Sequence, residues 1–374
     1  MTPTSTSATS TTATSTTVAS TAGTSMTAIG TAALSATVTL QPSGSTFRVA
    51  PGETVLEAAI RQNLQLPYGC RNGACGSCKA KIAQGQVDYG EHQAGTLTDE
   101  EKAVGKVLLC CARPLGDLTL EVRELASDGG VRIRILPCRV HRMEQRASTM
   151  MLWLKLPQND RLQFRAGQYI DFLLKEGRRR SFSMANAPGD DEFLQLHVRN
   201  YEGLFSGHVF DRMKERDILR LEGPLGSFYL RESAKPMVLV ASGTGFAPIK
   251  SIIEHCIATG VEREMVLYWG NRTLADMYAP EFPERWAREL PGFRFIPVLS
   301  EATAEGGWTG RTGFVHQAVI DDYPDLSGVQ VYACGSPLMV DAARRGFSAK
   351  RGLPEDEFFA DSFTVNEPPT VLAR

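Results

Sequence analysis

The first regular pattern of apolar and polar residues in this chain is an alternation with a period of two. Residues 36–40 and 45–49 follow it on either side of a Pro and Gly turn, which predicts a pair of strands. Thr54 stands directly before an apolar helical segment, residues 55–63, in the position of a helix cap. Residues 118–122 have the strand pattern again, so they are predicted to close a first small module.

A second module is predicted to be mostly β. Strand-like residues 131–136 and 150–156 are followed by several more short strands before Gly226. One helical stretch interrupts them at residues 207–215. This is the pattern of a small antiparallel barrel that carries a helix.

From Pro236 onward the pattern changes to strands that alternate with helices, which predicts an open parallel sheet. The predicted strands are residues 237–241, 265–269, 293–299 and 329–334, and the predicted helices are residues 249–259, 282–289, 315–321 and 338–345.

Length and composition support several domains. A chain of 374 residues exceeds what one hydrophobic core usually organises. No charged residue occurs before Arg48, and Thr, Ser and Ala dominate the start, so residues 1–35 are predicted to be a disordered tail, with Met26 as an alternative start. The predicted domains are residues 36–126, 131–232 and 233–367, with a Gly-containing linker at 128–130.

Charge and hydropathy exclude several classes of function. With 40 basic and 42 acidic residues, nothing in the net charge favours nucleic-acid binding. No apolar run approaches the roughly 20 residues that cross a membrane, so we expect a soluble cytoplasmic protein with no membrane partner. The six histidines lack metal-ligand spacing, and no Ser/His/Asp arrangement is evident.

The cysteines carry the strongest chemical signal. Cys70, Cys75 and Cys78 form a C-x4-C-x2-C run, and Cys110 stands apart, which is the plant-type [2Fe-2S] spacing. A zinc site is the alternative, but zinc modules usually offer two separated close pairs. Residues 36–126 resemble a plant-type ferredoxin domain, which implies a β-grasp fold. That resemblance favours Cys110 over its neighbour Cys111 as the fourth ligand.

A flavin signature follows in the second module. The run Arg180, Ser181, Phe182, Ser183 is similar to the R-x-[YF]-[ST] motif of the ferredoxin-NADP reductase superfamily. Arg180 can neutralise a pyrophosphate, Phe182 can pack along the flavin, and the Ser183 hydroxyl can hydrogen-bond near flavin N5. Further on in this module, the residues expected to contact FAD are His197, Val198, Gly203 and Ser206, the last two at a helix start that could hold the second phosphate or be only a capped turn.

A nucleotide signature follows in the third module. Gly243, Thr244, Gly245 and Pro248 lie in a glycine-rich turn between a strand and a helix, where phosphates bind. The superfamily has G-x-G-x-x-P at this place, and its C-G-x-P-x-M signature recurs here as Cys334, Gly335 and Met339.

The resemblance also implies roles for single residues near the nicotinamide. Cys334 is expected near nicotinamide C4, with a buried structural cysteine as the alternative. Phe363 is expected to shield the flavin, with core packing as the alternative, and Ser183, Cys334 and Phe363 together are the predicted catalytic residues. Arg272 could bind a 2′-phosphate or face solvent, and the absence of a second basic residue beside it favours NADH over NADPH.

Together the three signatures resemble reductase components of bacterial oxygenases and CDP-6-deoxy-3,4-glucoseen reductases. This resemblance implies that hydride passes from NAD(P)H to FAD, and single electrons then pass to a [2Fe-2S] cluster and on to a partner protein, an oxygenase or a deoxysugar dehydrase. A free-flavin reductase or a cluster-based redox sensor is the alternative.

Overall fold

The structure is a computed structural model that describes residues 35–125, 131–302 and 307–363. Apart from Ser35, the predicted tail therefore lies outside the described residues, as do the linker at 128–130 and the last four residues of the third predicted domain. The described residues belong to one compact unit.

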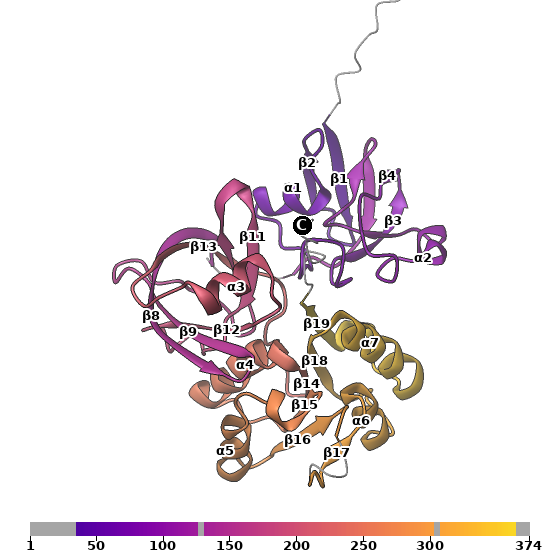
Figure 1. The fold of residues 1–374 in the computed structure, drawn as a ribbon. Coiled ribbons are helices and arrows are strands. Elements are labelled where there is room, and N and C mark those ends of the chain that lie inside the picture. Colours follow the sequence, from indigo (N-terminus) through magenta and orange to yellow (C-terminus); the bar gives the residue numbers. More distant parts are fainter. Residues whose placement is uncertain (1–34, 126–130, 303–306, 364–374) are drawn as a thin grey trace, which may run out of the picture. The chain divides into compact units, whose positions relative to one another are not determined.

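The first module is a mixed sheet in the order β2-β1-β7-β3-β5 (Figure 1). As predicted, β1 and β2 pair antiparallel, and the closing strand β7 joins β1 in parallel. Thr54 caps α1 with a capping box, although the helix ends at Arg61, earlier than predicted, because Asn63 takes a left-handed backbone with φ 59°. The elements are β1 Ala36–Gln41, β2 Thr46–Val49, α1 Val55–Arg61, β3 Lys79–Gln84, β4 Val87–Asp88, α2 Asp99–Ala103, β5 Lys106–Leu108, β6 Arg113–Pro114 and β7 Leu118–Glu121.

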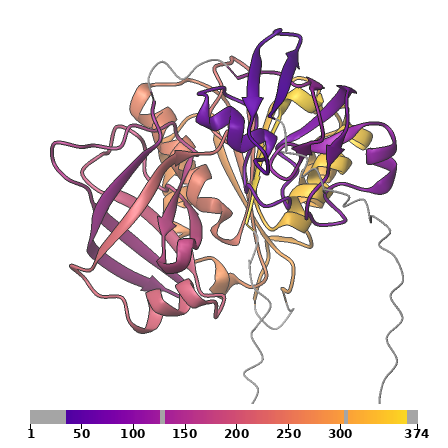
Figure 2. The same ribbon diagram turned by 90° about the horizontal axis from the view of Figure 1, so that it is seen from above.

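The second module is a six-stranded antiparallel sheet in the order β11-β10-β13-β8-β9-β12, and Figure 2 shows its strands curving around a common interior. A bridge between Met184, directly after β11, and Leu196 of β12 connects the two edges of the sheet, which closes the predicted barrel. The predicted helix at 207–215 is misplaced: α3 begins directly after its N-cap Gly203 and ends at Asp211. The elements are β8 Arg134–Arg146, β9 Thr149–Lys155, β10 Tyr169–Leu173, η1 Lys175–Gly177, β11 Arg179–Ser183, β12 Leu194–Arg199, α3 Leu204–Asp211 and β13 Ile218–Leu225.

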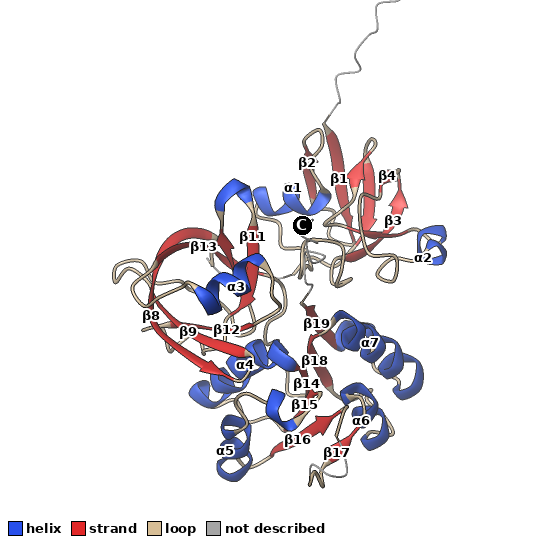
Figure 3. Cartoon of the chain, in the orientation of Figure 1, coloured by secondary structure: helices blue, strands red, loops and turns tan. Residues whose placement is uncertain are grey.

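The third module is the predicted parallel sheet, in the order β17-β16-β15-β14-β18-β19. One apolar cluster joins α4 and α5 to one sheet face, and a second joins α6 and α7 to the other, so helices cover both faces (Figure 3). The sequence pattern missed β19, which pairs with β18. The elements are β14 Met237–Ser242, η2 Gly243–Gly245, α4 Phe246–Thr259, β15 Met265–Asn271, η3 Leu274–Asp276, α5 Glu281–Glu289, β16 Phe293–Leu299, β17 Arg311–Thr312, α6 Val315–Asp322, β18 Gln330–Gly335, α7 Pro337–Arg351, η5 Glu355–Glu357 and β19 Phe358–Ser362.

Candidate functional site

The cysteine loop that precedes β3 turns its backbone N–H groups toward sulfur. The N–H of Ala74 donates to Cys70 Sγ at 3.4 Å, and those of Cys70 and Ser77 donate to Cys75 Sγ at 3.4 and 3.5 Å. Gly73 and Gly76 have φ of 73° and 72°, a conformation that glycine adopts without the penalty other residues meet. The loop therefore has the form expected of one that wraps a thiolate-bound cluster.

The four predicted ligands lie together in two pairs. In the first pair, a hydrogen bond between the Cys70 and Cys75 thiols raises the pKa of Cys70 and lowers the pKa of Cys75 to about 5. The second pair is Cys78 and Cys110. A hydrogen bond with Cys111 lowers the pKa of Cys110, but a hydrogen bond with Cys78 and burial outweigh it, so that the pKa is raised. The described residues contain no group of three or more His, Cys, Asp or Glu that could hold a metal ion. A [2Fe-2S] cluster needs only two thiolates at each iron, so two pairs fit it.

Cys111 lies beside this group, with its Sγ 3.5 Å from Cys110 Sγ. Both sulfurs are buried, and the contact with Cys78 belongs to Cys110, which fits its assignment as the fourth ligand. Cys138 and Cys256 are buried in the apolar clusters of the second and third modules, away from this loop, as core residues would be.

The predicted flavin residues occupy β11, next to β10. The Phe182 ring lies 5.8 Å from the Phe172 ring and 5.4 Å from the Phe205 ring. Ser183 is 4 % exposed, and its Oγ has no hydrogen-bond partner. A buried hydroxyl is rarely left unpaired in a protein, so this atom fits a site that expects a bound polar group. Arg180 is half-buried, and its guanidinium donates to Arg179 O at 2.8 Å.

His197 on β12 offers a second unpaired atom. Its Nδ1 lies 2.8 Å from the hydroxyl of Tyr278, whereas its buried Nε2 has no partner. Burial holds the pKa of His197 well below 6.5, and the nearby charges of Lys250 and Arg146 add to this, so the ring is neutral near pH 7. The neighbouring Val198 is buried. A neutral ring with one free nitrogen fits the predicted contact with FAD.

The start of α3 uses its polar groups locally. The Ser206 hydroxyl accepts the N–H groups of Gly203 at 3.2 Å and Tyr201 at 3.3 Å. This is helix capping, the alternative reading of the motif. Contact of Gly203 and Ser206 with a second phosphate stays a prediction.

The two nucleotide motifs meet at the carboxyl ends of β14 and β18, which pair in parallel. A Cβ at Gly245 would lie 2.1 Å from Cys334 O, and one at Gly335 would lie 2.1 Å from Ser242 Oγ. These two positions therefore accept only glycine without rearrangement. The turn lies at the strand ends where open α/β sheets bind ligands. Thr244, Pro248 and Met339 are buried beside it.

The remaining predicted residues lie around this edge. Cys334 is fully buried and its pKa is raised by burial, as an inert apolar wall requires. Phe363 is partly buried against the apolar cluster of the third module, and its N–H donates to Gly335 O at 2.8 Å. Both readings of Phe363, flavin shield and core residue, are compatible with that position. The Arg272 side chain is exposed.

Three further buried polar residues are not among the predicted site residues. Asn271, at the end of β15, is 8 % exposed and both polar atoms of its amide lack partners. Asp361, on the undetected strand β19, is 4 % exposed, and burial together with Cys75 raises its pKa to about 8. Asp171, on β10, is 1 % exposed and binds Arg71. The sequence pattern did not point to Asp171, because its partner Arg71 lies 100 positions away in the chain.

Three families match successive parts of the chain. Residues 38–115 match the 2Fe-2S iron-sulfur cluster binding domain, residues 138–229 the oxidoreductase FAD-binding domain, and residues 239–345 the oxidoreductase NAD-binding domain. No helix in the described residues is long and apolar enough to span a membrane.

Similar proteins match over almost the whole chain. CDP-6-deoxy-L-threo-D-glycero-4-hexulose-3-dehydrase reductase of Yersinia pseudotuberculosis is 41% identical over 336 residues, 89% of this chain and 100% of that protein. The reductase component of phenol 2-monooxygenase from a Pseudomonas species is 34% identical over 89% of this chain and 96% of that protein. The crystal structure of an Amycolatopsis cytochrome P450 reductase aligns with a TM-score of 0.71 and 35% identity over 89% of this chain and 100% of that chain.

Proposed function

Because this chain belongs to the family of FAD- and NAD(P)H-dependent reductases with an N-terminal 2Fe-2S ferredoxin domain, we propose that it delivers electrons to a partner protein, and that this partner is a sugar dehydrase. Within this family it is an NAD(P)H-dependent flavin and iron-sulfur oxidoreductase. The dehydrase is our first choice of acceptor because the Yersinia reductase named for such a dehydrase is 41% identical. An oxygenase is the second choice, supported by the phenol 2-monooxygenase reductase at 34%.

The single observation that carries this function is the presence of two unpaired buried polar atoms in the FAD-binding barrel. Ser183 Oγ and His197 Nε2 are buried without partners, and His197 contacts Tyr278 of the third module. FAD, when bound, supplies the change from two-electron to one-electron chemistry, and the cluster supplies a one-electron site.

Each group of residues has a task in this proposal. Ser183 would hydrogen-bond the flavin near N5, and Phe182 would pack along the ring. Arg180 would neutralise the pyrophosphate. The turn at Gly243 and Gly245 would receive the nicotinamide dinucleotide at a helix start.

Further residues would hold the other ends of the site. Cys334 would form an apolar wall beside the nicotinamide, and Phe363 would cover the flavin until the nicotinamide displaces it. Thiolates of Cys70 with Cys75, and of Cys78 with Cys110, would each hold one iron. We propose NADH as the donor, because no second basic residue adjoins Arg272 in the sequence.

The setting of the protein follows from its composition. All eight cysteines are free in the described residues, which supports a reducing compartment such as the cytoplasm. The net charge of -2 supports no nucleic-acid partner. We propose domain limits at 36–126, 131–232 and 233–367, within which the three family matches lie.

An anaerobic spectrum of the purified protein before and after one equivalent of NADH tests the electron path. Flavin and cluster absorption should both bleach. Flavin bleaching without a cluster signal would refute the ligand assignment, and loss of flavin on gel filtration would favour a free-flavin reductase.

The choice of acceptor is tested separately. The reduced protein should be reoxidised faster by the Yersinia dehydrase than by a phenol 2-monooxygenase hydroxylase component. The reverse order of rates would overturn the dehydrase assignment and leave the reductase activity intact.

A further inference from the structure

The cysteine loop is held by residues outside its own module. The N–H of Tyr68 donates to Ser227 Oγ at 2.8 Å, and the Tyr169 hydroxyl donates to Gly69 O at 2.8 Å. On the other side, Ser77 Oγ donates to Ala360 O at 2.9 Å. The loop is thus bonded to the FAD-binding barrel and to β19.

Arg71, the residue after Cys70, extends this attachment through its side chain. Its backbone is left-handed, with φ 58°, a conformation that costs free energy for a residue other than glycine. Its guanidinium Nη2 forms an ion pair with Asp171 Oδ2 on β10. The side chain of Arg71 is 26 % exposed and that of Asp171 is 1 % exposed. A strained backbone is therefore retained at a residue whose charge meets a buried carboxylate.

Asp171 connects this ion pair to the flavin strand. It faces Ser181 of β11 across the sheet, and its Oδ1 accepts the Ser181 hydroxyl at 2.6 Å. Ser181 lies between Arg180 and Phe182 in the flavin motif. Arg179 Nη1 also lies near Asp171, at 3.6 Å from Oδ2, and it pairs with Glu222 as well. Two side-chain contacts therefore lead from the cluster loop to the flavin strand.

We propose that Arg71 and Asp171 are positioning residues that couple the cluster loop to the flavin strand and thereby set the rate at which the cluster receives an electron. The inference rests on the proposed electron path from NADH through FAD. A buried ion pair adds little net stability, because desolvation opposes the attraction, but it specifies one arrangement of its partners. Its effect is thus expected in the rate of internal electron transfer and not in hydride transfer.

The experiment compares Arg71→Gln, Asp171→Asn and the double variant in the full chain loaded with FAD and cluster. Stopped-flow absorption after mixing with NADH separates flavin reduction from cluster reduction, and ferricyanide reduction reports hydride transfer alone. Hydrogen exchange of residues 68–77 reports how firmly the loop is held, independently of activity. The midpoint potential of the cluster is measured in each variant.

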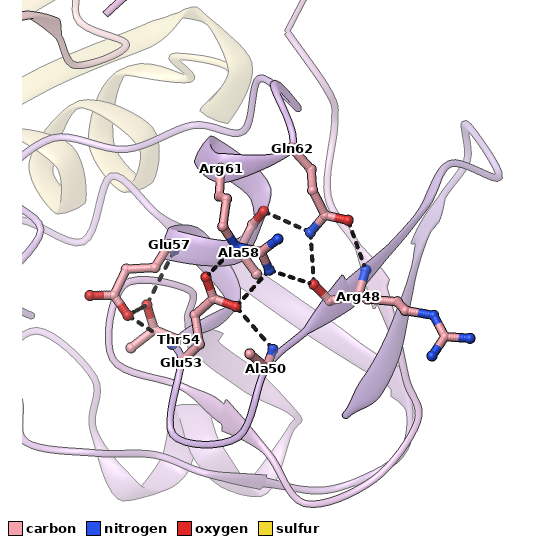
Figure 4. A network of polar contacts seen from close by, with 8 residues as sticks. All are labelled: Arg48, Ala50, Glu53, Thr54, Glu57, Ala58, Arg61 and Gln62. Atoms are coloured by element: carbon pink, nitrogen blue, oxygen red, sulfur yellow. Dashed lines mark hydrogen bonds and ion pairs between the residues drawn. The ribbon is translucent and has the colours of Figure 1, made fainter. Parts of the chain in front are cut away.

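Arg61→Gln is the matched control. Arg61 is an arginine of the same module, and its guanidinium donates twice to Glu53, at 2.8 Å each (Figure 4). Its polar network, which also includes Arg48 O, lies within the ferredoxin module. This variant removes one positive charge and one ion pair but leaves the attachment of the cluster loop unchanged.

Each single variant should slow cluster reduction by about tenfold, since a misplacement of about 1 Å can cost up to about 100-fold in rate. Flavin reduction and ferricyanide activity should stay within about twofold of the unmodified protein, and exchange of residues 68–77 should accelerate. The double variant should be no slower than either single variant, because both remove the same contact. Arg61→Gln should change none of these quantities.

Two results would overturn the proposal. One is unchanged cluster reduction and loop exchange in Asp171→Asn, a variant that leaves the cluster loop sequence intact even if Arg71→Gln fails to assemble a cluster. The other is a slower cluster reduction in Arg71→Gln that the shifted midpoint potential of its cluster explains fully. In that case a further variant, Arg71→Lys, which keeps the charge, would reduce the cluster at the normal rate. Failure of NADH to reduce flavin in the unmodified protein would instead refute the proposed function.

Discussion

Replacement of Lys250 by Met should weaken the attachment of the FAD-binding barrel to the nucleotide-binding domain. Lys250 lies on α4 and is 1 % exposed. Its ammonium group donates to Ala185 O at 3.0 Å and Gln195 Oε1 at 3.3 Å in the barrel, and to Glu254 Oε2 at 2.7 Å on its own helix. One buried cation therefore satisfies acceptors from both domains.

The magnitude follows from the burial of the two charges. Burial lowers the pKa of Lys250 and raises that of Glu254, so for each group burial outweighs the attraction of its partner. Removal of one member of a fully buried pair costs ~3–5 kcal/mol. Because the Glu254 side chain keeps 23% exposure, we expect a loss near ~3 kcal/mol for Lys250→Met. Methionine has a similar length, so little cavity is added.

Thermal unfolding monitored by FAD release measures this loss, which corresponds to a midpoint lower by about 6–12 °C for a unit of this size. The double variant Lys250→Met/Glu254→Gln should recover about half of it, because no unpaired charge remains. Lys81→Met is the control, since its ion pair with Glu121 at 3.2 Å is about half exposed. A single variant as stable as the unmodified protein, or a double variant less stable than the single one, would refute the reasoning.

Four further predictions concern the cofactor sites. Cys75→Ser should abolish the visible absorption of the cluster and retain ferricyanide reduction by NADH; loss of both in a folded protein would contradict the modular electron path. Arg180→Ala should weaken FAD retention on gel filtration by about tenfold or more, as loss of a charge-assisted contact of ~1.5–3 kcal/mol implies, and unchanged occupancy would exclude the pyrophosphate role. The pKa of His197 is lowered below 6.5, so the unfolded state takes up a proton first and stability falls as pH drops through that value. Urea unfolding measures this loss against the variant His197→Gln. Below pH 6.5 the free energy of unfolding of the unmodified protein should fall by up to about 1.4 kcal/mol per pH unit relative to the variant, and parallel pH profiles would disprove the pKa shift. Gly245→Ala would place a Cβ 2.1 Å from Cys334 O, so NADH should no longer reduce the flavin at its normal rate, and a normal rate would contradict the close approach.

The order of the three modules and most of their elements could be predicted because their signals are local. Strand pairing of β1 with β2, the capping of α1 by Thr54 and the alternation that forms the parallel sheet all depend on residues close in sequence. The cysteine spacing is local as well, apart from its fourth member. The predicted bounds of α3 were wrong at both ends, since the helix begins directly after its N-cap Gly203 and ends at Asp211.

How these modules meet depends on contacts between residues far apart in the sequence. The contact between Arg71 and Asp171 joins residues 100 positions apart, and β19 is a strand because β18 offers it a parallel partner. Burial also decided which groups have shifted pKa values, as for His197 and Asp361, because desolvation depends on every atom packed around a side chain. Local sequence motifs specify which cofactors this protein can hold, whereas the paths between the cofactor sites depend on contacts that no local pattern encodes.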